Sequence, residues 1–549
     1  MIEVSNIRVP LGRGGSEESL LAAARDDALR TLGLPASSLS QIELHRVSVD
    51  ARRKSDVHFT VSVHLALTDP RAEQIAVAAL PDRDARRVRL AEKNAPTWPR
   101  PAATTALPTT AHLRPVVVGA GCAGLFAALT LAEAGLEPLL IERGDDAERR
   151  TGAVERFNAV GDLDPESNIQ FGLGGAGTFS DGKLTTGTKN PAHRLILETL
   201  VDGGAPREIL WEAKPHVGSD ILPSVVTHIV ARIRARGGEV RFRCRLVDIE
   251  RDRGGAIAGI RLQTASGEER VACRDLVLAC GHSARDVFEL LRDRGVTLAR
   301  KTFAMGARVE HLQADIDRSQ YGSAAGHPAL GTAPYKLVAH TDTGRSLFTF
   351  CMCPGGEVVA AASEPGGVVT NGASLHARAG RNANAALLVN VNPQDLPGDD
   401  PLAGVELQRA CERRAFELGG GVFRAPAQLV GGFLAGVPST GAGAVEPTYP
   451  RGVAWGSVEE ALPVYIVDAM RHGLPELARR LRAFGAPDAV LTGVESRSSS
   501  PISVPRGADC ASVSTPGLFP CGEGAGYAGG IMSAATDGIR VATAIIERR

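Results

Sequence analysis

The sequence has few aromatic residues and lacks the patterns that mark several large protein classes. Phe, Trp and Tyr make up 4% of its 549 residues, so aliphatic side chains must fill the core. No apolar run reaches about 18 residues, so no membrane-spanning helix is expected. The 61 basic and 62 acidic residues leave a formal net charge of -1, which provides no overall attraction to nucleic acid or to anionic lipid.

The cysteine pattern excludes further classes of site. Nine cysteines are scattered without a CxxC pair, which excludes a zinc knuckle and a thioredoxin-type motif. The start of the chain has no hydrophobic signal region, and we expect a reduced, cytoplasmic protein. Glycine, by contrast, is abundant: 62 residues, against a usual share of about 7%, indicate many tight turns and close backbone approaches.

Residues 1–70 have the pattern of a small, separate β-α-β-β module. The predicted strands span 2–9, 42–49 and 57–67, and the predicted helix spans 16–33. Residues 50–54, DARRK, form a basic turn that is either simply solvated or binds RNA or an acidic partner. Residues 71–112 are rich in Pro and Ala, and we expect a linker that is helical at its start.

The strongest motif is the sequence GAGCAG, which follows an apolar strand predicted at 115–118 and precedes a helix predicted at 125–134. Gly119 permits the tight turn, and Gly121 lets the backbone approach a pyrophosphate. Gly124 lets the helix pack against the strand. This combination predicts a dinucleotide-binding site.

The elements after the glycines agree with that prediction. The helix N-terminus offers free N–H groups and a partial positive charge to phosphates. A second strand, predicted at 139–141, ends in Glu142, where an acid can bind ribose hydroxyls and disfavours the 2′-phosphate of NADP. The predicted cofactor-binding residues of this segment are Gly119, Gly121, Cys122, Ala123, Gly124, Glu142 and Arg143.

A second glycine-rich turn, TPGLFPCGEGAGYAGGI, spans residues 515–531 and predicts a strand, a turn and a helix. It resembles the glutathione-reductase-like class of FAD flavoproteins, in which a late strand presents an acid to the ribityl chain. Glu523 stands where that class usually has Asp. The resemblance implies that the next helix points its N-terminus at the pyrimidine edge of the flavin, where its dipole stabilises the anionic reduced form. The residues implied at the flavin are Gly522, Glu523, Gly530, Ile531 and Met532.

A second, NAD-binding finger at this turn is excluded. Tyr527 occupies the position of the third glycine, and too few residues follow it for another βαβ unit.

The middle of the chain fits the same class. Residues 239–271 alternate like a three-stranded meander, whose first strand we expect at 239–250, and an apolar strand ending at Gly281 follows. The resemblance implies that the backbone of Val247 faces the adenine and that the turn at Gly281 lies beside the cofactor. His282, next to this turn, either holds the turn or transfers a proton.

The sequence FGLGGAGTFSDGKL at residues 171–184 is the third glycine-rich block. Part of it has the spacing of a P-loop, but Leu184 replaces the magnesium-binding Ser or Thr, which argues against a nucleotide triphosphatase. In a flavoprotein this stretch runs beneath the pyrophosphate and along the isoalloxazine. Lys183 is either a ligand there or a solvated surface residue. The candidate ligands to flavin or substrate are Gly174, Gly175, Thr178, Ser180 and Lys183.

Nearly the whole chain resembles a family of FAD-dependent dehydrogenases of bacteria and plastids. Further segments that carry this resemblance are SVDARRKS near residue 50, KPHVGSD at 214–220, ACGHSARD at 279–286, GARVEH at 306–311, TFCMCPGGEVV at 349–359 and VESRSSSP at 494–501. The resemblance implies an α/β fold with a Rossmann-type FAD-binding domain of the glutathione-reductase-like class. We expect that domain in two parts, 113–285 and 486–549, around an inserted α+β substrate domain at 286–485.

Cys351-Met-Cys353 is the most notable feature of the inserted region. Strand alternation would put both thiols on one face. They are either a redox dithiol that passes electrons to the flavin or two buried cysteines that pack a strand. The candidate catalytic residues are Cys351, Cys353 and His282. Arg308, His311, His340 and Arg497 are candidate substrate anchors, and Asn382 and Asn384 are expected in turns or caps.

The expected function is that of an FAD-dependent oxidoreductase that transfers a hydride between flavin N5 and a small organic substrate. The electron partner stays open between oxygen, a quinone, a carrier protein and NAD(P)H bound without its own Rossmann unit. One alternative is a flavin-dependent RNA-modifying enzyme, which the neutral charge and scarce aromatics disfavour. The other is a non-catalytic flavin-binding redox sensor.

Overall fold

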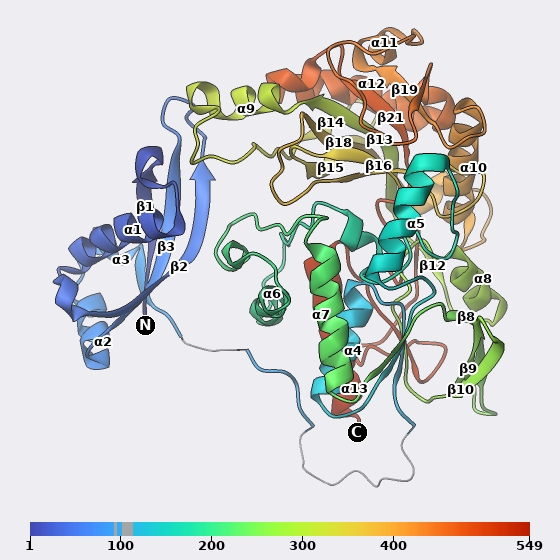
Figure 1. The fold of residues 1–549 in the computed structure, drawn as a ribbon, viewed down its shortest axis with the longest axis horizontal. Coiled ribbons are helices and arrows are strands. Elements are labelled where there is room, and N and C mark those ends of the chain that lie inside the picture. The colour runs from blue at the N-terminus through green and yellow to red at the C-terminus, as the bar shows by residue number, and fades with distance from the viewer. Residues whose placement is uncertain (93–95, 102–112) are drawn as a thin grey trace.

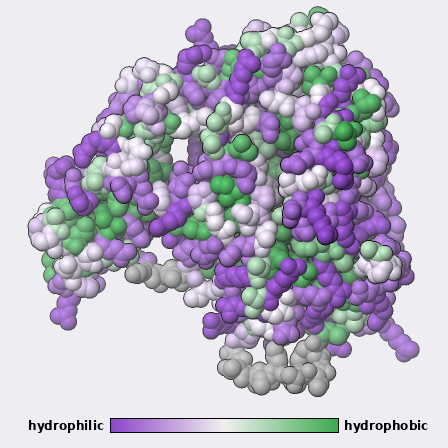
Figure 2. All heavy atoms as spheres, viewed as in Figure 1, coloured by the Kyte–Doolittle hydropathy of each residue, from purple (hydrophilic) through white to green (hydrophobic). Residues whose placement is uncertain are grey.

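The computed structural model describes residues 1–92, 96–101 and 113–549 (Figure 1). Residues 93–95 and 102–112 of the predicted linker lie outside the described residues. In the described ranges, no helix is both long enough and apolar enough to cross a membrane. Figure 2 shows hydrophilic and hydrophobic residues intermixed over one face of the molecule.

The N-terminal module is a four-stranded antiparallel sheet with the strand order β2-β3-β1-β4. Its elements are β1 (Ile2–Pro10), α1 (Glu17–Leu32), β2 (Leu39–Asp50), β3 (His58–Leu67), α2 (Pro70–Ala78), α3 (Asp82–Ala85) and β4 (Val88–Leu90). A capping box between Ser16 and Ser19 starts α1, and Gly33 ends it with a φ of 66°. The sheet continues past the predicted boundary at residue 70, because β4 is too short to be recognised by alternation but pairs with β1.

A parallel five-stranded sheet joins segments from opposite ends of the chain. Its order is β23 (Leu518–Pro520), β11 (Leu276–Leu278), β5 (Val116–Val118), β6 (Leu139–Ile141) and β7 (Glu239–Arg241). The four strands other than β7 are fully buried, as expected where helices cover both faces of a parallel sheet. Two of the helices, α4 (Cys122–Glu133) and α13 (Ile531–Glu547), touch so closely that a Cβ on Gly538 would overlap the carbonyl oxygen of Ala123.

The predicted first strand of the meander, 239–250, is in fact two strands. Arg243 has a φ of 54°, which breaks the extended backbone between β7 and β8. The separate antiparallel meander consists of β8 (Arg245–Arg251), β9 (Ile257–Thr264) and β10 (Gly267–Ala272). Periodicity alone could not show this break, because both pieces alternate.

The second large unit is a seven-stranded sheet, which Figure 1 shows above α4, α13 and α7 (Leu222–Ala235). Its order is β14 (Val338–His340), β15 (Ser346–Cys353), β18 (Asn382–Val391), β13 (Phe303–Leu312), β21 (Val490–Glu495), β19 (Ala425–Leu429) and β20 (Val453–Trp455). Strand β21 lies beyond the expected end of the inserted region at residue 485, yet it pairs with β13 and β19.

Shorter strands and further helices complete the two large units. The short strand pairs are β12 (Ala299–Arg300) with β22 (Ile502–Ser503), and β16 (Glu357–Ala360) with β17 (Thr370–Ala373). The helices are α5 (Ala147–Val160), α6 (Ala192–Asp202), α8 (Arg285–Asp293), α9 (Gln313–Tyr321), α10 (Ala403–Leu418), α11 (Val430–Ala435) and α12 (Val464–Arg480).

The N-terminal module is attached to the rest of the chain by backbone hydrogen bonds. The N–H of Val47 on β2 donates to the carbonyl of Trp211 at 2.8 Å, and the N–H of Ala213 donates to the carbonyl of Val47 at 2.8 Å. Trp211 and Leu330 also pack against the core of the module. The module therefore rests on the body of the protein along β2.

Candidate functional site

Three segments that are far apart in the sequence meet at the N-termini of α4 and α13. Gly121 and Gly174 form an isolated β-bridge, which joins the first glycine motif to the third glycine-rich block. A Cβ on Gly177 would lie 3.3 Å from Cγ1 of Ile531 and 3.4 Å from Sγ of Cys122. The predicted pyrophosphate and flavin segments are therefore neighbours in space.

The three glycines of the first motif have different surroundings. Gly119 has a φ of 97°, and a Cβ on Gly124 would overlap the carbonyl oxygen of Gly119, so these two glycines make the tight turn itself. A Cβ on Gly121 would meet only the Cα of Gly175, at 3.8 Å. Gly121 is the N-cap of α4 and no side chain caps it. The open helix N-terminus forms a cradle of the kind that binds phosphate, and in this respect the residues present fit a dinucleotide.

Glu142, at the end of β6, joins the neighbouring loops by hydrogen bonds. Its Oε2 accepts the N–H of Ala120 at 2.7 Å, and its Oε1 accepts the N–H groups of Gly144 at 2.9 Å and Gly172 at 3.0 Å. We still predict that the remaining lone pairs of Glu142 accept hydrogen bonds from the ribose hydroxyls. The adjacent Arg143 forms ion pairs with Glu166 and Asp286, which orient its guanidinium.

Arg150 on α5, which no sequence motif predicted, fixes the glycine-rich loop by hydrogen bonds. Its side chain is fully buried and donates to the carbonyls of Asn168 (2.9 Å), Leu173 (2.6 Å), Ile169 (2.9 Å) and Gly175 (2.9 Å). Burial lowers the pKa of Arg150 to about 10, so the side chain stays charged at neutral pH. No local signal distinguishes this arginine, because all four acceptors are backbone atoms of a distant loop.

We expect Arg150→Met to reduce the free energy of unfolding by about 3 kcal/mol, because several buried carbonyls lose a charged donor. The loop then loses its fixed conformation against α4, and flavin content should fall as well. Chemical denaturation and the flavin-to-protein absorbance ratio measure the two effects. The adjacent Arg149, whose side chain is 76% exposed, provides a matched control. Arg149→Met should change stability by no more than about 0.5 kcal/mol, and an equal effect of both substitutions would contradict this role of Arg150.

The polar residues predicted in this loop also stabilise it. Thr178 donates to the carbonyl of Leu173 at 3.2 Å, and Ser180 donates to the carbonyl of Gly177 at 2.7 Å. Lys183 forms an ion pair at 2.9 Å with the buried Asp181. The side chain of Lys183 is 29% exposed, which does not fit a freely solvated surface lysine.

Cys351 and Cys353 lie on β15, but the strand is irregular between them. Cys351 has a φ of 42°, and the pairing of β15 with β18 shifts between Phe350 and Cys353. The simple alternation expected for the two thiols is therefore interrupted. The Sγ of Cys353 donates to the carbonyl of Cys351 at 3.2 Å.

The positive charges of Lys183 and Arg308 act on Cys351, and the negative charge of Asp181 opposes them. The pKa of Cys351 is held well below the usual range, first by a hydrogen bond from Cys353 and then by the charges of Lys183 and Arg308, against the opposing effect of burial. The pKa of Cys353 is well above its usual range, because it is the hydrogen-bond donor of the pair and is buried. Of the two thiols, Cys351 is therefore the one whose ionised form its neighbours favour.

Arg308 on β13 is fully buried next to Cys351. It binds Glu495 through two parallel hydrogen bonds of 3.0 Å, and it donates to the Asn384 side chain at 2.9 Å and to the Cys351 carbonyl at 3.0 Å. The expectation that Asn382 and Asn384 lie in turns is wrong, because both are buried in β18. Oδ1 of Asn384 accepts from Arg308, and Nδ2 of Asn382 donates to Glu310, both on the adjacent strand β13.

At the C-terminal turn, Glu523 stands next to the uncapped N-terminus of α13. Burial raises the pKa of Glu523 to about 7, while a hydrogen bond from the Gly530 backbone and the charge of Lys301 act in the opposite direction. Gly530 has a φ of 87° and no side chain caps the helix. The N–H of Gly522 donates to Asp537 at 2.8 Å. Glu523 can therefore exchange a proton near neutral pH.

His282, Gly281 and Val247 lie around the second turn. Burial lowers the pKa of His282 to about 4, with a further contribution from Arg497 and Arg285, so its imidazole is neutral at pH 7. A Cβ on Gly524 would overlap the backbone of Gly281, so the two glycine turns are in close contact. Val247 lies at an irregularity of β8, and its contact with adenine stays a prediction.

The remaining candidate anchors are distributed over the second unit. Arg497 forms an ion pair with the buried Glu412, and His311 is buried with its Nε2 3.2 Å from the Phe484 carbonyl. His340 is exposed on β14. These three do not form one group with Cys351.

Comparison with known proteins agrees with this site. Family models match residues 114–155 as an FAD binding domain, 223–372 as an FAD dependent oxidoreductase and 302–498 as an FAD-dependent protein, C-terminal domain-like. Residues 1–66 match a domain of unknown function. A Clostridium beijerinckii protein described as uncharacterized is 43% identical over 520 residues, covering 94% of this chain and 95% of that protein.

Solved structures are much more distant. The 3-ketosteroid-delta4-(5alpha)-dehydrogenase of Rhodococcus jostii RHA1 is 14% identical, with 82% of this chain and 99% of that chain covered and a TM-score of 0.35. A geranylgeranyl bacteriochlorophyll reductase-like protein of Thermoplasma acidophilum is 12% identical, with 79% and 78% covered and a TM-score of 0.34. TM-scores this low do not indicate a function. The family models and the Clostridium relative identify the chain as FAD-dependent.

Proposed function

The chain belongs to the same family as the Clostridium beijerinckii protein and is an FAD-dependent oxidoreductase, and we propose that it belongs to the glutathione-reductase-like class and acts on a small organic substrate. The observation that carries this proposal is the meeting of Cys122, Gly177 and Ile531 at two uncapped helix N-termini. FAD held by these residues would supply two-electron redox chemistry.

The residues present divide the binding of FAD between two helices. The N-terminus of α4, kept open by Gly121, holds the pyrophosphate. The loop at residues 174–183 and the N-terminus of α13 hold the flavin, where the helix dipole favours negative charge. Gly522 and Glu523 bind the ribityl chain. The chain thus orients the cofactor from two sides.

Charged groups near Cys351 determine which side chains of the site carry a proton during the reaction. Glu523 and Cys351 influence each other's ionisation, as do Lys183 and Cys351. With a pKa of about 7 before FAD binds, Glu523 can take either the protonated or the ionised form at neutral pH. We assign Cys351 as the group of this pair that would ionise near the bound flavin, and His282 as a neutral group that supports the turn rather than carrying charge.

Thiol alkylation of the holoenzyme tests the assignment of Cys351. We expect one thiol to react with iodoacetamide with an apparent pKa below the ordinary value of 9.0, and Cys351→Ser to remove that reaction. Cys353→Ala removes the principal hydrogen bond to the thiolate, and Lys183→Met removes a positive charge. Both should move the pH profile upward, whereas a purely structural role of Cys351 predicts no shift.

The substrate can be identified from the loss of flavin absorbance when the flavin is reduced. Anaerobic mixing of the yellow holoenzyme with candidate reductants should bleach the flavin absorbance for a true substrate, and subsequent addition of oxygen or a quinone identifies the electron acceptor. Cys351→Ser should slow bleaching by about tenfold or more, corresponding to about 1.4 kcal/mol in the barrier. Protein purified without flavin, and unable to bind added FAD, would contradict the proposed function.

A further inference from the structure

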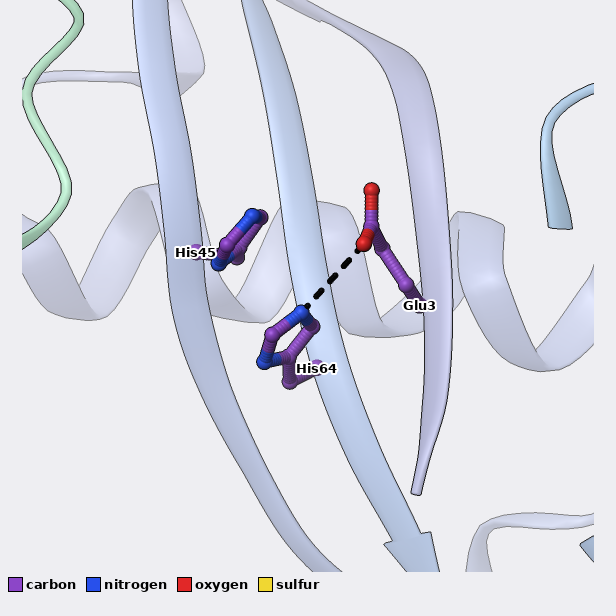
Figure 3. A group of neighbouring side chains, drawn as sticks. All are labelled: Glu3, His45 and His64. Carbon is purple, nitrogen blue, oxygen red and sulfur yellow. Dashed lines mark ion pairs between the residues drawn. The ribbon is translucent and has the colours of Figure 1, made fainter. Parts of the chain in front are cut away.

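A second cluster of chemically active side chains lies in the N-terminal module, away from the flavin site. Glu3 on β1, His45 on β2 and His64 on β3 project from adjacent strands on one side of the sheet (Figure 3). Their positions follow from the strand pairing. Glu3 lies directly opposite His64, and His45 is the unpaired residue of a bulge between Leu44 and Arg46.

The three side chains are close enough to share one ion. One potential ligand atom from each of them lies within 4.8 Å of the others. Nε2 of His64 is 3.5 Å from Oε2 of Glu3, and the rings of His45 and His64 are stacked with their centroids 4.0 Å apart. Among the described residues, the buried Nε2 of His64 has no hydrogen-bond partner. This nitrogen faces the Glu3 carboxylate, with which it forms an ion pair only when the ring is protonated, and it lies beside a second imidazole. The three side chains therefore bring the ligand atoms of a cation site together.

We propose that Glu3, His45 and His64 bind a divalent transition metal ion of the Zn²⁺ type. Two imidazoles and one carboxylate match the nitrogen and oxygen ligands that Zn²⁺ takes, and three protein ligands leave one tetrahedral position for water or another ligand.

Two charged residues beside the proposed ligands affect metal binding in opposite directions: Glu43 favours it, and Arg89 competes with the metal ion. Nδ1 of His64 lies 3.9 Å from Oε1 of Glu43, beyond hydrogen-bond distance, so this carboxylate supports the ligand through its negative charge. Arg89 competes, because it donates to Oε2 of Glu3 at 3.0 Å through Nε and at 2.7 Å through a terminal nitrogen. The Arg89 side chain is 72% exposed, so displacing this ion pair costs little.

Metal titration of the full-length holoenzyme tests the site. We expect Zn²⁺ to bind at one equivalent in competition with a chromophoric chelator, and Co²⁺ to show the absorption of a low-symmetry nitrogen and oxygen site. His64→Ala and His45→Ala should each weaken binding by about 100-fold or more, and Glu43→Gln by about tenfold. Arg89→Ala should strengthen binding, because it removes the competing cation.

The variants are chosen so that misfolding cannot imitate the result. His472, an exposed histidine on α12, is the matched control, and His472→Ala should leave affinity unchanged. Zn²⁺ should raise the unfolding midpoint of the wild type but not of His64→Ala. An absence of stoichiometric binding, or equal affinity in wild type and His64→Ala, would overturn the proposal. Weaker binding in Arg89→Ala would do so too.

Discussion

Gly121→Val should give a folded protein that has lost its flavin. A Cβ at this position meets no protein atom closer than 3.8 Å, and the backbone φ of -74° suits any residue. The apoprotein should therefore lose no more than about 1 kcal/mol, the cost of a poorer N-cap. The added methyl groups occupy the cradle in front of α4, where the backbone must approach the pyrophosphate. We expect flavin content to fall by more than about tenfold, equivalent to about 1.4 kcal/mol or more of binding free energy.

The neighbouring glycine separates loss of cofactor from loss of fold. In Gly124→Ala the new Cβ would overlap the carbonyl of Gly119, so the turn itself must move. This variant should lower the stability of the flavin-free protein as well as its flavin content. Flavin released by denaturation and thermal unfolding of the apoproteins measure the two quantities. Full flavin content in Gly121→Val would place the pyrophosphate elsewhere.

Arg308→Met should be among the most destabilising single changes in the second unit. Arg308 and Glu495 are both buried and bind each other through two hydrogen bonds of 3.0 Å. Removing one partner of a buried ion pair leaves an uncompensated charge and costs about 3–5 kcal/mol. Denaturant unfolding of the variant and the wild type measures the difference.

The effect should depend on pH in a defined direction. Burial already raises the pKa of Glu495 above its ordinary value of 4.5, and loss of Arg308 raises it further. In the folded variant Glu495 keeps its proton at pH values where the unfolded chain has released it. The free energy of unfolding therefore falls as the pH rises above 4.5, the ordinary pKa of the carboxyl. The loss relative to wild type should be larger at pH 8 than at pH 5. Arg318, 68% exposed on α9, is the control, and Arg318→Met should change stability by about 0.5 kcal/mol at most. A similar loss in both variants would argue against a buried ion pair.

Several features of the site could be predicted because each depends on a short stretch of chain. The first glycine motif, its flanking strands and Glu142 occupy 27 consecutive residues, 116–142, and all lie where local pattern placed them. The turn around Glu523 was recognised in the same way. The assignments of FAD and of an oxidoreductase agree with the family models.

Other features depend on partners that are distant in sequence. Arg150 is one arginine among many until the loop at 168–175 folds around it. Asparagine is common in turns, but Asn384 lies inside a sheet, where its Oδ1 accepts a hydrogen bond from Arg308 on the neighbouring strand. The altered backbone at Cys351 follows from a shift in pairing with β18. The lengths and angles of such contacts are not encoded in periodicity.

The sequence by itself determined the strand, the glycine turn and the helix near residue 120, and that the cofactor is FAD. Only the tertiary structure decided that β11 lies between β5 and β23, and thereby brought residues near 120 and 530 to one place. It also decided which charges surround Cys351 and which side chains line up across β1, β2 and β3. The physical reason is that motifs and propensities act over a few residues, whereas strand pairing, burial and charge compensation are settled only when the whole chain packs.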